Sequence, residues 1–121
     1  MLIKKNEPPR KFTVGKNSNI MITDAASIIL GGDEQVTFMR GNKEFDVCSK
    51  NWGFYATPSI NGRLKSFGYK ACICSNPEAK IFILLVDNDK LEEFYKYIDE
   101  EALEILAWID ESLIQSIKGE V

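Results

Sequence analysis

The sequence contains no histidine. A histidine general base and a Ser–His or Cys–His nucleophile pair are therefore excluded. The commonest protein ligand of transition metals is missing as well. Any catalysis by this chain would depend on carboxylates, lysine, tyrosine or cysteine. The sequence favours a protein that is not an enzyme, and we expect neither a cofactor nor a bound metal ion.

Long hydrophobic runs are missing too. The longest spans residues 81–86, which is far too short to cross a bilayer. The basic N-terminus is not followed by an apolar segment and a cleavage site, so no signal peptide is expected. The three cysteines, Cys48, Cys72 and Cys74, are interpreted as free thiols of a reducing compartment. These features predict a cytoplasmic protein without a membrane partner.

No motif for binding nucleotides or RNA can be read from the sequence. It has neither a GxGxxG nor a GxxxxGK[ST] loop, and it has no RNP-like motif. Charge is distributed unevenly: residues 1–70 carry eleven Lys and Arg and six Asp and Glu, whereas residues 71–121 carry four and twelve. The acidic second part makes a nucleic-acid partner unexpected. The two parts either form two faces of opposite charge or mix on one surface.

The first half of the chain has the pattern of an antiparallel β-meander. Pro8-Pro9 favours an extended arm over residues 1–10, followed by a single α+β domain over residues 11–121. Short apolar or β-branched runs separated by turn residues then predict strands at 11–15, 19–23, 26–30, 35–39 and 44–48. The glycine-containing segment 31–34 predicts a hairpin turn between the third run and the fourth.

The second half predicts a mixed sheet with helices. Strands are expected at 53–57, 69–74 and 80–86, the last a central strand with both faces covered. A helix is expected at about 89–99, N-capped by Asp87 or Asn88. Residues 103–108 fit a strand or a helix, and we favour a strand followed by a short helix at about 110–118. The fold class is therefore α+β, with the meander continuing into a mixed sheet.

A segment without acidic residues, 47–77, is the strongest candidate site. Its cations alternate with aromatic side chains, as a phosphate-bearing ring ligand requires. Guanidinium and ammonium groups pair with phosphate, aromatic rings stack, and hydroxyl and amide groups bind polar atoms. We therefore predict a non-catalytic module for an anionic small molecule: a nucleotide, nucleotide-sugar or phosphosugar. The predicted ligand-binding residues are Trp52, Tyr55, Ser59, Asn61, Arg63 and Lys65.

Other interpretations stay open. The aromatic residues fit equally well into strand pairs of the core, and Asn61-Gly62 fits a hairpin turn. The protein could instead be an accessory protein-interaction subunit, or a homodimer joined through an edge strand. A small enzyme that uses carboxylates is the third alternative. We interpret Cys72 and Cys74 as core thiols rather than zinc ligands, and the acidic loop 87–89 as a helix cap rather than a Mg²⁺ site.

Two stretches carry a resemblance to other proteins. The sequence WGFYATPSINGRL at 52–64, followed by KIFILLV at 80–86, resembles small uncharacterised bacterial proteins encoded among surface-polysaccharide biosynthesis genes. The resemblance implies a setting in glycan assembly in the cytoplasm. It implies no mechanism and assigns no role to any residue.

Overall fold

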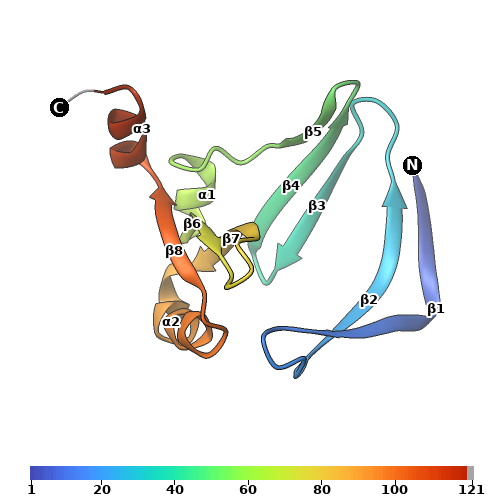
Figure 1. The fold of residues 1–121 in the computed structure, drawn as a ribbon. Helices are drawn as coiled ribbons and strands as arrows, with labels where there is room; N and C mark the ends of the chain where they lie inside the picture. Colours follow the sequence, from blue (N-terminus) through green and yellow to red (C-terminus); the bar gives the residue numbers. More distant parts are fainter. Residues whose placement is uncertain (120–121) are drawn as a thin grey trace. The chain divides into compact units, whose positions relative to one another are not determined.

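The computed structural model describes residues 1–119, which divide into two compact units, 1–57 and 58 onward (Figure 1). The structure consists mainly of antiparallel strands with a few short helices, so the predicted α+β class is confirmed. The last two residues of the domain expected over 11–121 lie outside the described residues.

A long hairpin begins the first unit. Strand β1 (Leu2–Val14) pairs antiparallel with β2 (Ile20–Ile29), and the two form a sheet of their own (Figure 1). Residues 1–10, expected as an arm, belong to β1 from Leu2 onward. The pairing is interrupted between Lys5 and Arg10, where Pro8-Pro9 lies. Proline lacks the backbone N–H that a regular ladder needs, so the strand bulges there.

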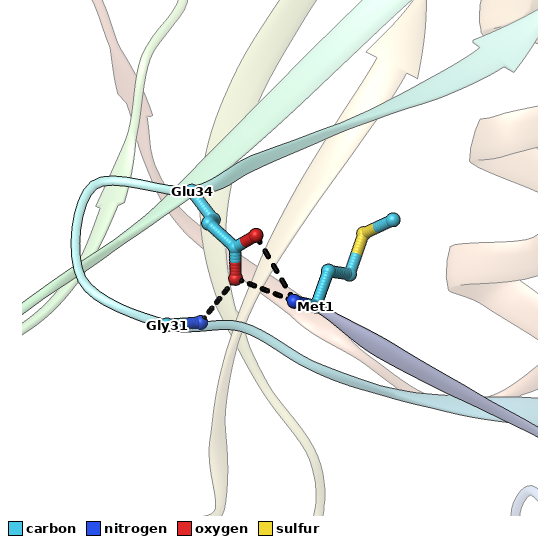
Figure 2. Close-up of polar contacts among 3 residues, drawn as sticks. All are labelled: Met1, Gly31 and Glu34. Carbon is cyan, nitrogen blue, oxygen red and sulfur yellow. Dashed lines mark hydrogen bonds and ion pairs between the residues drawn. The ribbon is translucent and has the colours of Figure 1, made fainter.

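The segment after β2 does not turn back on it, so the hairpin predicted between 26–30 and 35–39 is wrong. Glu34 holds the segment in another shape: its carboxylate accepts a hydrogen bond from Gly31 N at 2.6 Å and pairs with the Met1 ammonium at 3.0 Å (Figure 2). These contacts, the Gly31 bond foremost, lower the pKa of Glu34. Backbone bonds from Asp33 N to Ser49 O and from Ser49 N to Glu34 O then direct the chain along β4.

The predicted meander is present as a three-stranded sheet. Strands β3 (Gln35–Arg40), β4 (Lys43–Lys50) and β5 (Gly53–Ala56) follow one another with antiparallel pairing. The turn between β3 and β4 contains Gly41 at φ +61°, a conformation that glycine adopts without a steric penalty. This short connection sets the register in which Phe38 lies opposite Phe45.

Each sheet of the first unit has one apolar face. Directly paired residues share a face and successive residues alternate. The hairpin face, as we name it, consists of Ile3, Phe12, Val14, Ile20, Ile22, Ala26 and Ile28, interrupted by Lys5 and by the Arg10–Asp24 ion pair. The meander face consists of Val36, Phe38, Phe45, Val47, Phe54 and Ala56. Neither face contains a buried side chain.

The second unit is built on a sheet of order β7-β6-β8, in which β6 (Tyr69–Ser75) pairs antiparallel with β7 (Ile81–Asp87) and with β8 (Glu104–Ile109). The strand favoured at 103–108 is thus present as β8, one residue further along the chain. The single mixed sheet expected from the sequence is replaced by three separate sheets, in all of which the described pairs are antiparallel. Strands β7 and β8 run in the same direction, but β6 lies between them.

The prediction that 80–86 is the central strand is wrong. Strand β7 is an edge strand, and the side chains of Ile81 and Ile83 are 67% and 68% exposed. The central place belongs to β6, whose small side chains Ala71, Cys72 and Cys74 are buried. An apolar run indicates a strand, but it does not show whether a later segment of the chain will add to its edge.

Short helices alternate with the strands of the second unit. The turn helix α1 (Arg63–Ser66) precedes β6, the predicted helix is α2 (Leu91–Glu100), and α3 (Glu111–Ile117) follows β8. Asp87 begins the 3₁₀ turn η1 (Asn88–Lys90) that leads into α2, because its carboxylate accepts a hydrogen bond from Asp89 N. This supports the capping interpretation of the acidic loop.

All buried apolar side chains of the described residues lie in the second unit. They are Leu64, Tyr69, Ala71, Cys72, Cys74 and Val86, together with Pro58. Helix α2 packs against the same sheet, where the ring centroids of Phe94 and Trp108 are 6.0 Å apart. The second unit therefore has its own core, which the first unit lacks.

The β6–β7 turn depends on one amide side chain. Asn76 Oδ1 accepts hydrogen bonds from Glu78 N at 3.0 Å and Lys80 N at 2.9 Å. Replacing the amide in Asn76→Ala is expected to lower the free energy of unfolding by about 1–2 kcal/mol, because two backbone donors lose their acceptor. The conservative variant Asn76→Asp keeps an acceptor oxygen and should lose less. Urea unfolding measures both, and equal losses would contradict this role.

Candidate functional site

The six predicted ligand-binding residues fall into both units. Trp52 lies in the turn between β4 and β5 and Tyr55 lies on β5, both exposed and both in the first unit. The other four, Ser59, Asn61, Arg63 and Lys65, lie in the turn before α1 and in α1 itself, in the second unit. The chain thus brings them together as two local groups.

Ser59 organises the turn that leads into α1. Its hydroxyl accepts a hydrogen bond from Arg63 N at 3.1 Å, and its carbonyl accepts from Gly62 N and Leu64 N. A Cβ atom at Gly62 would lie 2.2 Å from the Ser59 hydroxyl, so a side chain there would displace the hydroxyl that Arg63 N contacts. Gly62 has a φ of −117°, which differs from the positive φ of the hairpin turn considered for Asn61-Gly62. The turn presents Arg63 and Lys65 on an exposed helix, with Leu64 buried between them.

Two further cations of the basic segment have partners of their own. Lys50 Nζ donates a hydrogen bond to Asp33 Oδ1, and this contact raises the pKa of Lys50. Lys70 Nζ lies 3.9 Å from the centroid of the Trp108 ring, in the geometry of a cation–π interaction. The contact between Lys70 and Trp108 could not be predicted from the sequence, because it depends on how the distant strands β6 and β8 pair.

A buried carboxylate in the first unit was also missed. Asp46 on β4 is 3% exposed and is the only buried residue among residues 1–57. Its Oδ2 accepts a hydrogen bond from the Thr57 hydroxyl at 3.1 Å, and its carbonyl accepts from Thr57 N. The alternation of residues along β4 predicted that Asp46 lies with Glu44 on a polar face, and such faces are usually exposed to solvent. Thr57 therefore satisfies a charge whose burial would otherwise be costly.

The three cysteines are free thiols, as the sequence indicated. Cys72 and Cys74 are buried on one face of β6, and burial raises the pKa of both thiols. Cys48 is half-buried on β4. Among residues 1–119, no group of three or more Cys, Asp or Glu side chains is arranged to hold a metal ion.

No helix of the described chain is long and apolar enough to cross a membrane. Searches for a matching family model, a similar curated protein and a similar solved structure found no match to this chain. The resemblance to proteins of polysaccharide gene clusters therefore stays a prediction, and any function must be argued from the side chains themselves.

The Thr57–Asp46 contact gives a stability prediction. The variant Thr57→Val keeps the shape of the side chain but removes the donor to a buried carboxylate. We expect it to lower the free energy of unfolding by about 1.5–3 kcal/mol. Thr37→Val on β3 is the control, because Thr37 is an exposed threonine opposite Asp46 in the same sheet. Chemical denaturation measures both, and a loss no larger than the control's would show that the contact is not stabilising.

The thiols give a reactivity prediction. With a disulfide reagent such as DTNB at pH 8, native protein should show one fast-reacting thiol, Cys48, because the other two are buried and resist ionisation. Cys72 and Cys74 should react at the rate of unfolding, and the variant Cys48→Ser should lose the fast phase. Three equally fast thiols in native protein would contradict the burial of β6.

Proposed function

We propose that this protein is a non-catalytic interaction subunit, which binds a protein partner through the open apolar surfaces of residues 1–57. One observation carries the proposal. Fourteen large apolar side chains of this unit are exposed and none is buried. The unit therefore contains the kind of side chains that form a core, but it does not bury them. Contiguous exposed apolar surface of this kind marks interaction sites in soluble proteins.

The arrangement of these side chains supports an interface over random exposure. Seven of them lie on the hairpin face or the meander face, where cross-strand pairs such as Phe12–Ile22 and Phe38–Phe45 are directly adjacent. Burying one such side chain completely is worth about 1.5–3 kcal/mol. An isolated two-stranded hairpin is only marginally stable in water, so covering these faces would stabilise the unit as well as bind a partner.

The aromatic residues near the β4–β5 turn add anchor groups. Trp52 and Phe54 are 68% and 69% exposed, and Tyr55 follows directly. Aromatic side chains contribute most to protein interfaces because they bury a large area at a small entropic cost. The first unit also has a nearly balanced charge, with eight Lys and Arg against six Asp and Glu, so its apolar faces do not carry a strong repulsive field.

The proposal is tested on the meander face with a dye that binds exposed apolar surface. We expect wild-type protein to enhance the fluorescence of anilinonaphthalene sulfonate, and the double variant Phe38→Ser/Phe54→Ser to lose most of the enhancement. Stability should change by no more than about 0.5 kcal/mol per site, because both side chains are exposed.

The control is Ile117→Ser on α3, which removes an exposed apolar side chain of the second unit. It should leave the fluorescence unchanged. If native wild-type protein does not bind the dye, the apolar faces are covered by the chain itself and the proposal fails.

A small anionic ligand is the second candidate. It is supported by Arg63 and Lys65, which lie exposed on one turn of helix in an otherwise acidic unit, with seven Lys and Arg against twelve Asp and Glu in residues 58–121. A nucleotide, nucleotide-sugar or phosphosugar would then raise the melting temperature of wild-type protein by mass action. Arg63→Glu should abolish the shift and Lys118→Glu, at the far end of the unit's sequence, should keep it. A shift retained by Arg63→Glu would contradict this site.

A further inference from the structure

We infer that β2 pairs with the β2 strand of a second copy of this chain, antiparallel about a two-fold axis at Ala25, which joins two hairpins into a four-stranded sheet β1-β2-β2-β1. This inference deepens the proposed function, on which it rests, by naming one partner of the first unit and the edge that binds it. It depends on the two free edges of the hairpin and on the residue pattern of β2.

The two edges of the hairpin differ in how open they are. Because β1 and β2 form a two-stranded sheet, each has one unpaired edge. Strand β1 contains Lys4, Lys5, Pro8-Pro9, Lys11 and a register shift, which are the features that prevent a strand edge from pairing. Strand β2 contains no proline, no lysine and no glycine, and Asp24 is its one charged residue. The open edge is therefore that of β2.

The sequence of β2 is symmetric in its chemistry about Ala25. From residue 20 to Leu30, the first residue after the strand, the sequence reads IMITD-A-ASIIL, with three apolar residues at each end and small or polar residues between. In an antiparallel pair with its axis at Ala25, the opposite pairs are Ile20–Leu30, Met21–Ile29, Ile22–Ile28, Thr23–Ser27 and Asp24–Ala26. Apolar residues meet apolar residues, and hydroxyl meets hydroxyl. Such cross-strand matches are the main source of sheet stability.

Neighbouring registers are less favourable. In a symmetric antiparallel pair, directly opposite residues lie on the same face of the sheet, and side chains alternate between the faces along each strand. Opposite residues must therefore be an even number of positions apart in the sequence, which places the two-fold axis at a residue and not between two residues. With the axis at Asp24, two like charges would be directly opposite, which is destabilising. With the axis at Ala26, Asp24 would lie against the apolar Ile28. At Ala25 each Asp24 faces an alanine and keeps its ion pair with Arg10 of its own hairpin, at 2.6 Å.

Pairing in this register would also extend the hairpin face. Ile22 and Ile28 of one copy would lie opposite Ile28 and Ile22 of the other, so the apolar face would double in width while remaining open. A sheet of four strands with one apolar face is sufficient for independent stability, whereas a hairpin is not. The pairing thus accounts for why a long hairpin is present without a core beneath it.

Disulfide trapping tests the register. On a Cys48→Ser background, Ala25→Cys places two thiols opposite each other, where Cα atoms of paired strands lie about 4.5–5.5 Å apart, within the range of a disulfide. Mild oxidation should give a covalent dimer on a non-reducing gel. Ala26→Cys is the matched control, because its two copies would be diagonal neighbours about 7–8 Å apart, beyond disulfide reach. Failure of Ala25→Cys to cross-link, or equal cross-linking of both variants, would overturn the inference.

A charge variant tests the pairing without an oxidant. Ala26→Asp would face Asp24 of the second copy twice in each dimer, whereas within its own hairpin it would face Lys5. We expect the dissociation constant from sedimentation equilibrium to rise about 2- to 30-fold, from two like-charge pairs. The opposing Lys5 should preserve the hairpin, which circular dichroism verifies. An unchanged dissociation constant would contradict the pairing.

The outcomes separate this inference from the proposed function. Weak dimers form at protein concentrations of about 100 μM. Wild-type protein that stays monomeric at that concentration and binds the apolar dye would overturn the β2 pairing and leave an interaction surface for another partner. A monomer that binds no dye would overturn both. A dimer that cross-links through Ala25→Cys and binds the dye would support both, because pairing at the edge leaves the sheet faces open.

Discussion

The central position of β6 is the constraint on which the packed part of this protein depends. A strand paired on both sides has no open backbone edge, and its side chains project from the two faces of the sheet with side chains of both neighbouring strands beside them. Ala71, Cys72 and Cys74 are small enough for that place, and they are among the least exposed residues of the chain. The neighbouring strands, the α2 helix between them in sequence and the cation–π contact of Lys70 with Trp108 are all arranged around this strand.

The first unit lacks such a strand with a covered face, and this explains its different character. Strand β4 is paired on both sides, yet the side chain buried on it is a carboxylate, Asp46, held by Thr57. None of the apolar residues of this unit is buried. The strands of this unit are therefore regularly paired, but their apolar side chains are not packed into a core. The proposed function is based on these unpacked side chains.

Sequence reasoning succeeded where the signal was local. Helical spacing at Leu91 and Phe94 located α2, alternation located β4, and the favoured strand at 103–108 is β8. It failed where the outcome depended on distant pairing. The turn residues Gly31 and Gly32 fitted a hairpin, but backbone bonds to Ser49 direct the chain elsewhere. The apolar run of β7 fitted a central strand, but β6 took that place. For the candidate site, composition identified exposed aromatic and basic residues, whereas the Asp46–Thr57 contact had no local signal.

The interruption in β1 has a consequence for how the length of this protein can change. Between Lys5 and Arg10, five residue steps of β1 lie opposite two steps of β2, from Ala26 to Asp24, so β1 carries a surplus of three residues. Directly paired residues share a face, so Leu2 and Ile3 keep their faces as long as they stay opposite Ile29 and Ile28. Losing three residues there would remove the surplus and leave an uninterrupted ladder, in which Lys5 still lies opposite Ala26 and two steps from Arg10. The cross-strand pairing, and not the length of β1, therefore sets which side chains form the hairpin face, and an in-frame deletion of three codons in the interruption preserves that face.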